Sequence, residues 1–475
     1  MKNITMTLAS ASALLLAPQA KLAIAQTPDA VTHKGVSDTP AYSTPENPWL
    51  VDTAVLSYQE SGRVSALKPV IGLSKDFGDE HVLSIKLVSD TLTGASPSGA
   101  APANVVQTVT GPSGSGQGYV KPKSSSYIAS GDDDDDDDDD HDNDEHDDDH
   151  ESYSTVLTPA KLSVNTFRDR RTAISLGWAQ PWGGNQKLNV GANFSSEYDY
   201  LSVGVNGGMS HDLNDKNTTL SWGLALQSDT ISPVGGTPVG LGEKSSTQRL
   251  GEQSKTVTEG MLGLTQILNT KAFYQLSYSA AQSQGYLTDP YKILTLLDSQ
   301  YQLIPAAAAD EYRYLNEKRP QKRLRHALLN RIKFQLHPDL IVDASHRLTQ
   351  DDWGVKSQTV DLRLRIDLAQ KLYYLEPHFR FYSQTKADFY RPYLVQGQIG
   401  SYASADSRLG AFDAKTVGLK WGWNIGPNQE FSLLVDRYEQ TPNAPPAPAS
   451  GSLAGQIMQP GLSAVSTQIA YRFQW

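Results

Sequence analysis

The chain has 475 residues, of which 39% are hydrophobic and 20% are charged. This balance excludes a chain that is disordered throughout, and beyond the N-terminus no apolar run reaches the roughly 18 residues that a transmembrane helix needs. The absence of cysteine excludes disulfides, thiolate metal sites, cysteine nucleophiles and a lipid-modified N-terminal cysteine. The 22 Tyr, 8 Trp and 37 Gly suit strands and aromatic girdles better than helices.

The N-terminus has the pattern of an export signal. Lys2 precedes an apolar stretch over residues 4–17, and Ala23-Ile24-Ala25 fits the small-x-small pattern of a signal-peptidase site. We expect residues 1–25 to be a signal peptide, 26–48 a periplasmic N-terminal segment and 49–475 the folded body. A short amphipathic helix is the alternative, but polar residues do not recur there at helical spacing.

Acidic residues are concentrated in one segment. Residues 132–151 hold 14 Asp and 2 Glu, and without them the formal charge changes from −11 to +5. A run of like charges with nothing apolar to bury does not fold alone. Its flanks are rich in Ser, Gly and Pro, so we expect residues 95–165 to form one long, mobile loop that contains the disordered acidic run.

Most of the remaining chain alternates between apolar and polar residues. From Val360 to Leu368 every second residue is aliphatic and every residue between is charged, which is the period of a strand and not of a helix. This pattern predicts an all-β fold. Sixteen such segments start near Leu50, Val64, Val82, Phe167, Lys187, Tyr200, Thr218, Thr256, Lys271, Arg323, Leu340, Val355, Leu372, Ala414, Gln429 and Ser463.

The connections between these segments also alternate. Every second one has the chemistry of a tight turn, whereas the long excursions (95–165, 229–255, 283–322, 385–413 and 440–462) all fall on the others. Short turns on one rim, long loops on the other and an even strand count are typical of bacterial outer-membrane barrels. The sequence therefore predicts a single antiparallel, porin-like transmembrane β-barrel of about 16 strands in the outer membrane of a Gram-negative bacterium, with short periplasmic turns and long extracellular loops.

The last segment of the sequence ends in aromatic residues. Tyr471, Phe473 and Trp475 share one face of the alternation. We interpret them as a membrane insertion signal that the barrel assembly machinery reads. A soluble β-sandwich that ends on a core strand is the alternative.

Several short stretches resemble an uncharacterised family of bacterial outer-membrane barrels, a domain of unknown function. The resemblance runs from about residue 49 to the C-terminus, and its clearest stretches are residues 90–97, 191–194, 197–200, 233–236, 286–292, 351–354, 375–378 and 387–391. The resemblance implies a barrel over nearly the whole mature chain and assigns no activity. Members are often encoded near a small lipoprotein, a thioredoxin-like protein and a flavin transferase. This implies an exported redox or metal-handling system, with outer-membrane lipid and a periplasmic redox protein or small lipoprotein as partners; no nucleic-acid partner is expected.

Charged side chains between the aliphatic ones define the candidate site. If the aliphatic face meets lipid, the barrel interior receives a lumen charge cluster: Lys86, Asp361, Arg363, Arg365, Asp367, Glu376, His378, Arg380, Lys420 and Arg472. Arg323, Arg325, Arg331 and Lys333 belong to a strand whose phase the sequence leaves open. Such a cluster attracts anions or orients a plug. Alternatively, its charges pair and stiffen a polar wall.

The acidic run is a candidate for weak divalent-cation binding through Asp140, His141, Asp144, His146, Asp149 and His150. It lacks the spacing of an EF-hand, and a solvated spacer is the alternative reading. We expect no other cofactor.

Motifs of enzymes are missing from the sequence: there is no G-x-S-x-G, H-E-x-x-H or Walker A pattern. We expect a pore or a surface-exposed component and not an enzyme. The alternatives are a closed scaffold or binding barrel, and an outer-membrane hydrolase assembled from separate strands. Tyr314, Arg319, Tyr390 and Arg391, in the predicted rim loops, either recognise a ligand or order the loops.

Overall fold

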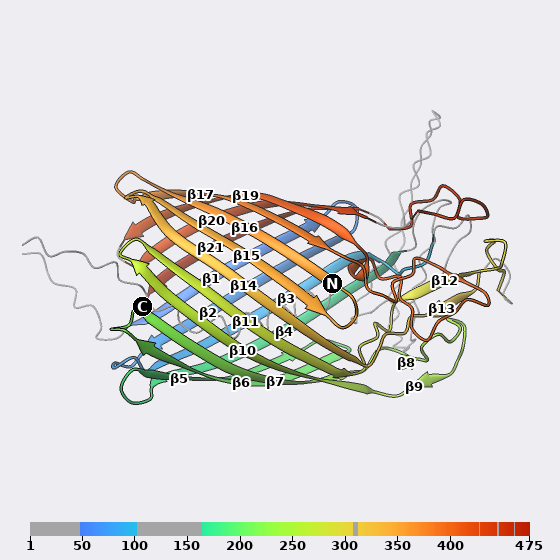
Figure 1. Cartoon of the computed structure of the whole chain (residues 1–475), viewed down its shortest axis with the longest axis horizontal. Helices are drawn as coiled ribbons and strands as arrows, with labels where there is room; N and C mark the ends of the chain where they lie inside the picture. The colour runs from blue at the N-terminus through green and yellow to red at the C-terminus, as the bar shows by residue number, and fades with distance from the viewer. Residues whose placement is uncertain (1–47, 102–163, 307–311, 427, 444–445, 460) are drawn as a thin grey trace, which may run out of the picture.

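Sixteen strands close into one antiparallel barrel (Figure 1). The computed structural model describes residues 48–101, 164–306, 312–426, 428–443, 446–459 and 461–475. The barrel closes where the first strand pairs with the last, from Leu50 opposite Gln474 to Glu60 opposite Ala464. In barrel order the strands are β1 (Trp49–Glu60), β2 (Val64–Asp76), β3 (Val82–Pro97), β4 (Val164–Pro181), β5 (Gln186–Ser196), β6 (Tyr200–Leu213), β7 (Thr218–Ile231), β10 (Gln253–Asn269), β11 (Ala272–Gly285), β14 (Lys322–His337), β15 (Leu340–Asp351), β16 (Lys356–Leu368), β17 (Tyr373–Gln384), β19 (Phe412–Gly426), β20 (Gln429–Pro442) and β21 (Leu462–Gln474).

The predicted fold class is confirmed. Sixteen strands were expected, and each expected start lies within three residues of an observed one; the largest differences are at β4 and β10. Closure pairs the backbone of every barrel strand with two neighbours, so no edge of the barrel sheet is left unpaired.

The aliphatic face of each strand points away from the barrel. In β7, Leu220, Trp222, Leu224 and Leu226 are 39–53% exposed, although they are large and apolar. A sandwich would bury these side chains between two sheets, so the predicted sandwich alternative is wrong. The residues between them face the bore, which is the arrangement of a barrel whose outer surface meets lipid.

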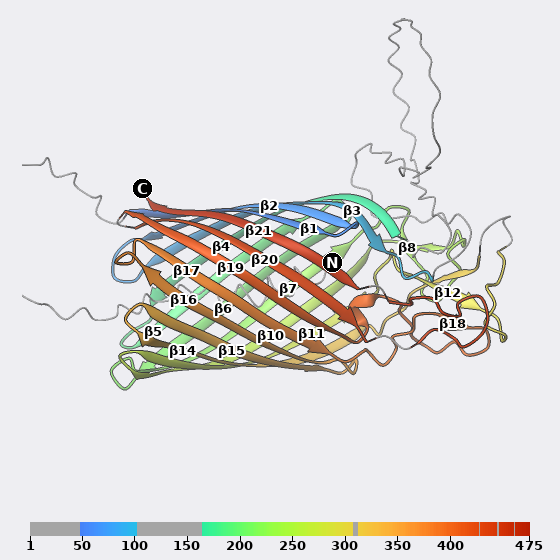
Figure 2. The same cartoon turned by 90° about the horizontal axis from the view of Figure 1, so that it is seen from above.

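The two ends of the barrel differ (Figures 1 and 2). One end carries only short turns, such as residues 214–217 between β6 and β7 and residues 369–372 between β16 and β17. Asn214, Asp215 and Lys216 all have positive φ angles, which a hairpin this tight requires. The long connections gather at the other end, as the alternation of connection lengths predicts.

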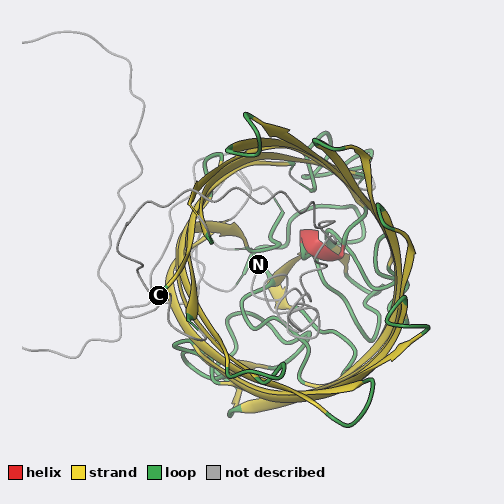
Figure 3. Ribbon diagram, turned by 90° about the vertical axis from the view of Figure 1, so that its left-hand side faces the viewer, coloured by secondary structure: helices red, strands yellow, loops and turns green. Residues whose placement is uncertain are grey.

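The long loops fold into a cap. We define the cap as residues 98–101 together with the described loop residues between β7 and β10, β11 and β14, β17 and β19, and β20 and β21. It contains β8 (Thr237–Pro238), β9 (Arg249–Leu250), β12 (Ile293–Leu297), β13 (Tyr314–Asn316), β18 (Leu394–Val395) and the 3-10 helix η1 (Ser407–Leu409). β12 pairs with β13 in antiparallel and with β18 in parallel orientation. The view along the barrel shows the cap loops and η1 across the bore (Figure 3).

Hydrophobic packing is concentrated in and beneath the cap. One cluster joins Leu294, Leu296, Leu315, Leu394 and Ala403, and a second packs Trp353 against Phe389 at a ring-centroid distance of 5.1 Å. The cap thus has its own apolar core, separate from the lipid-facing surface of the barrel. Among the described residues no helix is long and apolar enough to cross a bilayer.

Candidate functional site

Strands β14 to β17 form the most highly charged part of the lumen wall. Period-two alternation turns their charged residues inward, and basic ones outnumber acidic ones by eight to five. The phase of β14 is now defined, because Leu328 faces outward with Leu348, its partner in the register. The basic residues are Arg323, Arg325, Arg331, Lys333, Arg347, Arg363, Arg365 and Arg380, and the acidic ones are Asp343, Asp351, Asp361, Asp367 and Glu376.

Several of these charges pair across neighbouring positions. Arg331 Nε donates to Asp343 Oδ1 at 2.8 Å, and Arg365 Nε donates to Asp367 Oδ1 at 2.8 Å. Arg323 Nε lies 2.7 Å from Asp351 Oδ2. Part of the wall is therefore a network of neutralised pairs, which agrees with the wall-stiffening interpretation of the charge cluster.

His378 is held between two carboxylates. Its Nε2 lies 3.1 Å from Asp361 Oδ2 and its Nδ1 lies 2.9 Å from Asp436 Oδ1. Asp436 belongs to β20 and reaches His378 across β19, where the intervening residue is Gly418. A Cβ atom at position 418 would overlap the Asp436 carboxylate. Glycine is therefore required there for the contact between the two strands.

A second contact of this kind lies nearer the turn end of the barrel. Tyr374 is fully buried on the lumen side, and its hydroxyl donates to Glu430 Oε1 at 2.6 Å. The Arg365 guanidinium lies 3.8 Å from the centre of its ring, within cation–π range. Gly422 leaves room for this ring, because a Cβ atom there would overlap it. Lys420 Nζ of β19 lies 3.7 Å from Glu430 Oε1, so this carboxylate of β20 contacts both Tyr374 and Lys420.

Three arginines near the cap form no such close pair. No carboxylate of a described residue forms an ion pair with Arg325, Arg347 or Arg380 within 4.0 Å. Arg347 is repelled by Arg380 and, less strongly, attracted by Glu259 of β10. Arg325 interacts with Glu259 as well. We call Arg325, Arg347 and Arg380 the arginine cluster; it gives this part of the lumen an excess of positive charge.

Two further predicted lumen residues lie near the seam where β1 pairs with β21. Arg472 Nε of β21 donates to Asp52 Oδ1 of β1 at 2.5 Å. Asp52 is opposite Gly72 of β2 in the register, and Gly72 is opposite Lys86 of β3. Lys86 is thus separated from the β16–β17 group by several strands. Glu376 lies opposite Lys420 in the register. Sequence reasoning missed Arg347, Asp343 and Asp52, although the same alternation marks all three.

A buried ion network joins two loops of the cap. Arg319 Nε lies 2.6 Å from Glu317 Oε1, and Arg319 also donates to Asp406 Oδ2 at 2.8 Å. Arg408 donates to Asp289 Oδ2 at 2.8 Å and pairs with Asp406. These five residues connect the β11–β14 and β17–β19 loops through charge-assisted hydrogen bonds.

Burial and charge act in opposite directions in this network. Burial alone raises the pKa of Asp406, but Arg408 and Arg319 outweigh it and hold the pKa well below 3.8. The pKa of Asp289 is lowered in the same way, chiefly by Arg408. For Glu317 burial dominates over Arg319 and raises the pKa, and burial also lowers the pKa of Lys292.

The four predicted rim residues make contacts within the chain. Tyr314 packs with Ile293 and Ala100, and Arg319 belongs to the ion network. Tyr390 donates its hydroxyl to Gln459 Oε1 at 3.2 Å, and Arg391 donates to the backbone oxygens of Asp388 and Tyr390. These contacts are those that the loop-ordering interpretation predicts.

The predicted metal residues of the acidic run, 140–150, lie outside the described residues, as do residues 1–47. Among the described residues, Asp169, Glu197 and Asp199 bring carboxylate oxygens within 4.8 Å of one another. The Tyr291 hydroxyl donates to Asp199 Oδ2 at 2.5 Å. Three carboxylates are a donor set suited to Ca²⁺ or Mg²⁺, so this group is a second candidate cation site.

The predicted insertion signal lies on the outward face of β21. The rings of Tyr471 and Phe473 stack with centroids 5.3 Å apart. Trp475 is 78% exposed, and its backbone pairs with that of Trp49 through hydrogen bonds of 2.7 and 2.8 Å. The aromatic residues therefore lie at the seam where the barrel closes.

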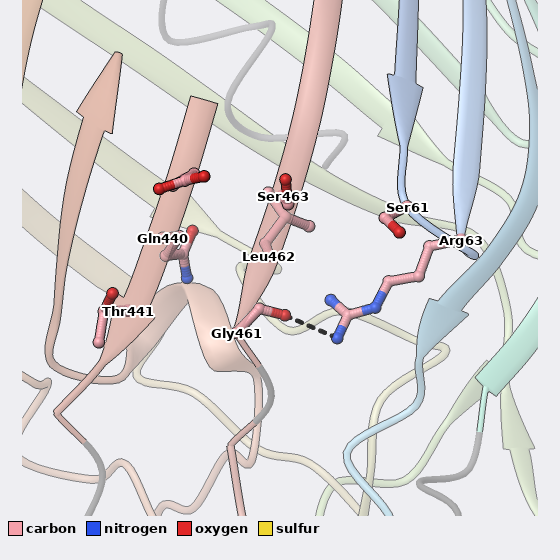
Figure 4. Close-up of a pocket in the computed structure, with 8 residues that line it drawn as sticks. Ser61, Arg63, Gln440, Thr441, Gly461, Leu462 and Ser463 are labelled. Carbon is pink, nitrogen blue, oxygen red and sulfur yellow. Dashed lines mark hydrogen bonds between the residues drawn. The ribbon is translucent and has the colours of Figure 1, made fainter. Parts of the chain in front are cut away.

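A polar pocket opens at the cap end of the same seam (Figure 4). It encloses about 450 Å³ between the β1–β2 turn and strands β20 and β21. Arg63 crosses its mouth and donates from Nη2 to the Gly461 carbonyl oxygen at 2.9 Å. Ser463 and Glu439 both line it, but among the described residues the Glu439 carboxylate accepts its hydrogen bonds from Arg437 and not from a serine hydroxyl.

The fold and the polar lumen together define a barrel of the bacterial outer-membrane class. The chain matches the family described as "Protein of unknown function (DUF3570)" over residues 5–473, and it therefore belongs to this family. The family resemblance that the sequence suggested is confirmed. No curated protein matches the sequence.

Solved structures of similar fold include membrane proteins of different kinds. The CymD monoaromatic hydrocarbon channel is 8% identical, with 90% of this chain and 88% of that chain covered and a TM-score of 0.37. A bacterial polysaccharide outer membrane secretin is 10% identical, with 90% and 100% covered and a TM-score of 0.39. The ferric enterobactin receptor PfeA is 10% identical, with 89% and 60% covered and a TM-score of 0.40.

Proposed function

We propose that this protein is a non-catalytic outer-membrane pore with a hydrated, anion-attracting lumen beneath a folded extracellular cap. One observation carries the proposal: charged side chains inside the barrel remain open to solvent. Arg363 on β16 is 49% exposed and Arg472 on β21 is 53% exposed. Side chains in a packed bore would be buried, and a 16-stranded barrel is wide enough to hold water.

The arginine cluster supports the preference for anions. Rings of like charge that line a pore set its ion selectivity, and the excess of basic residues on β14 to β17 lies where the lumen meets the cap. An anion that enters from the cap side reaches Arg325, Arg347 and Arg380 before the paired charges below.

We place the pore in the outer membrane of a Gram-negative bacterium, because its outward surface is apolar and its two rims are polar. Outer-membrane lipid and the barrel assembly machinery are then its partners. We further propose that it serves an exported redox or metal-handling system together with a periplasmic redox protein or small lipoprotein. The acidic run and the Asp169, Glu197 and Asp199 group are the candidate cation sites that we assign to such a role.

A second candidate function is a closed barrel that holds or displays a partner. The cap favours it, because its apolar clusters and buried ion network are those of a fixed lid across the bore. A pore with this cap must conduct around it or through openings between its loops.

Conductance in planar lipid bilayers distinguishes the two. The purified protein should give steady ohmic openings, and a KCl gradient should give a reversal potential displaced towards chloride. Absence of openings at a protein concentration where a known porin conducts would contradict the pore and favour the closed barrel. Openings that prefer potassium would contradict the role given to the arginine cluster.

A further inference from the structure

Two strongly polar residues lie in the middle of the lipid-facing surface. Asn330 of β14 and His346 of β15 are directly opposite each other in the register. Leu328 and Ile332 flank Asn330 on the outward face, and Leu348 follows His346 on the same face. Both residues lie close to the centres of their strands, so they face the apolar layer of the membrane and not its edge.

This pair is unusual in the barrel. At the centres of the other fourteen strands that the structure describes, the outward residue is aliphatic, aromatic, Gly, Pro, Ser or Thr. An exposed amide and an imidazole in hydrocarbon lose their hydrogen bonds to water without replacement. Polar residues at this depth indicate that something other than lipid covers them.

The neighbouring outward residues satisfy only part of this polarity. Tyr274 donates its hydroxyl to Asn330 Oδ1 at 2.8 Å, which leaves the Asn330 amide hydrogens available. Higher on the same strands, the Tyr278 hydroxyl lies 2.7 Å from His326 Nδ1. Among the described residues, no side chain hydrogen-bonds the His346 imidazole.

A groove continues this surface towards β6. It has a volume of about 550 Å³. Trp222, Leu262 and Tyr278 line it with large side chains, and Gly207 and Gly260 line it without side chains. Tyr278 belongs to both features, since it lines the groove and contacts His326. We call the groove and the outward residues around Asn330 and His346 the docking face.

We infer that the docking face binds the same face of a second copy of this chain. A two-fold axis along the membrane normal would place Asn330 of each copy opposite His346 of the other, because the two residues are neighbours in the register at nearly equal depth. The amide offers donors and an acceptor, and the imidazole offers one of each, so both contacts can form at once. A lipid acyl chain offers neither. This inference depends on the proposed membrane location and not on transport.

Photo-cross-linking in outer-membrane vesicles tests the inference with the full-length protein. Leu348 is replaced by p-benzoylphenylalanine, and the matched control carries the same residue at Val55, outward on β1 and far from the docking face in the strand order. Irradiation should give a product of twice the chain mass from position 348 and none from position 55. The double variant Asn330→Leu, His346→Leu should reduce the product at least several-fold, whereas His346→Gln should retain it.

The other outcomes overturn the inference. A lipid adduct alone, an adduct with a different protein or no adduct at position 348 would each exclude the second copy, and equal products at positions 348 and 55 would indicate crowding. Heat-modifiable migration in gels shows whether each variant is folded, and His346→Gln provides a conservative variant if the double variant does not fold. Bilayer conductance is not part of this readout, so failure of the pore proposal is recognised separately.

Discussion

Gly418 shows how a single residue without a side chain organises the lumen. It lies between His378 and Asp436 in the register, and its missing Cβ lets a carboxylate from β20 reach an imidazole on β17. Period-two alternation predicted that His378 faces the lumen. It did not predict the contact with Asp436, because residues 378 and 436 meet only after an intervening strand has been placed between theirs.

Replacement of this glycine tests the contact. Gly418→Val should displace Asp436 and lower the free energy of unfolding by about 1–3 kcal/mol, the usual cost of overpacking. Urea unfolding in detergent micelles measures the change. Gly72→Ala is the matched control, because its added Cβ would meet only ordinary contacts at 3.6 Å, and it should have a much smaller effect. Equal effects of the two substitutions would show that the glycine is not needed for this contact.

At the scale of elements, strands were far more predictable than the cap. Strand positions follow from local alternation, so residues such as Val360 to Leu368 determine their own conformation and phase. The cap depends on contacts between distant loops: Arg408 meets Asp289 across 119 positions, and β12 pairs with β18. No local pattern marks such partners, which is why Arg319 was recognised as a rim residue but not as part of a buried network.

The pKa shifts in the cap predict how it responds to acid. Asp289 and Asp406 have pKa values below their ordinary 3.8, so the stability they contribute is fully present above that value and is lost as the pH falls through the lower folded pKa. The hydrogen-exchange protection factors of residues 286–306, which correct for the pH dependence of intrinsic exchange, should therefore stay high from pH 7 to about pH 4 and fall only below it. Arg408→Gln should move this loosening to higher pH. A wild-type cap that opens above pH 5 would contradict the assignment.

The arginine cluster, which is supplied by β14, β15 and β17, should determine the anion selectivity of the pore. Replacing Arg325, Arg347 and Arg380 by Gln removes charges that form no ion pair with a carboxylate of a described residue, so the anion preference should fall several-fold while the barrel stays folded. The reversal potential in a KCl gradient measures it. Lys86→Gln, a lumen cation on β3, serves as the control and should have a smaller effect. An unchanged reversal potential in the triple variant would place selectivity elsewhere.

For the whole molecule, the account depends on which side of the wall meets water. Apolar side chains are exposed on the outside, charged ones are exposed inside, and the cap carries the packed core. Apolar residues therefore face outward and polar residues inward, the reverse of their places in a soluble protein. Each strand must alternate between the two faces, which explains why the strands were recognisable without any knowledge of their partners.

Labelling of single cysteines at adjacent positions tests this arrangement most directly, because the natural chain has no cysteine. Arg363→Cys and Leu362→Cys lie side by side on β16 with opposite orientation. In outer-membrane vesicles a water-soluble thiol reagent should modify position 363 rapidly and leave position 362 unmodified, and both should react in denaturant. Equal reaction at both positions in the membrane, or reaction at position 362 alone, would contradict the account.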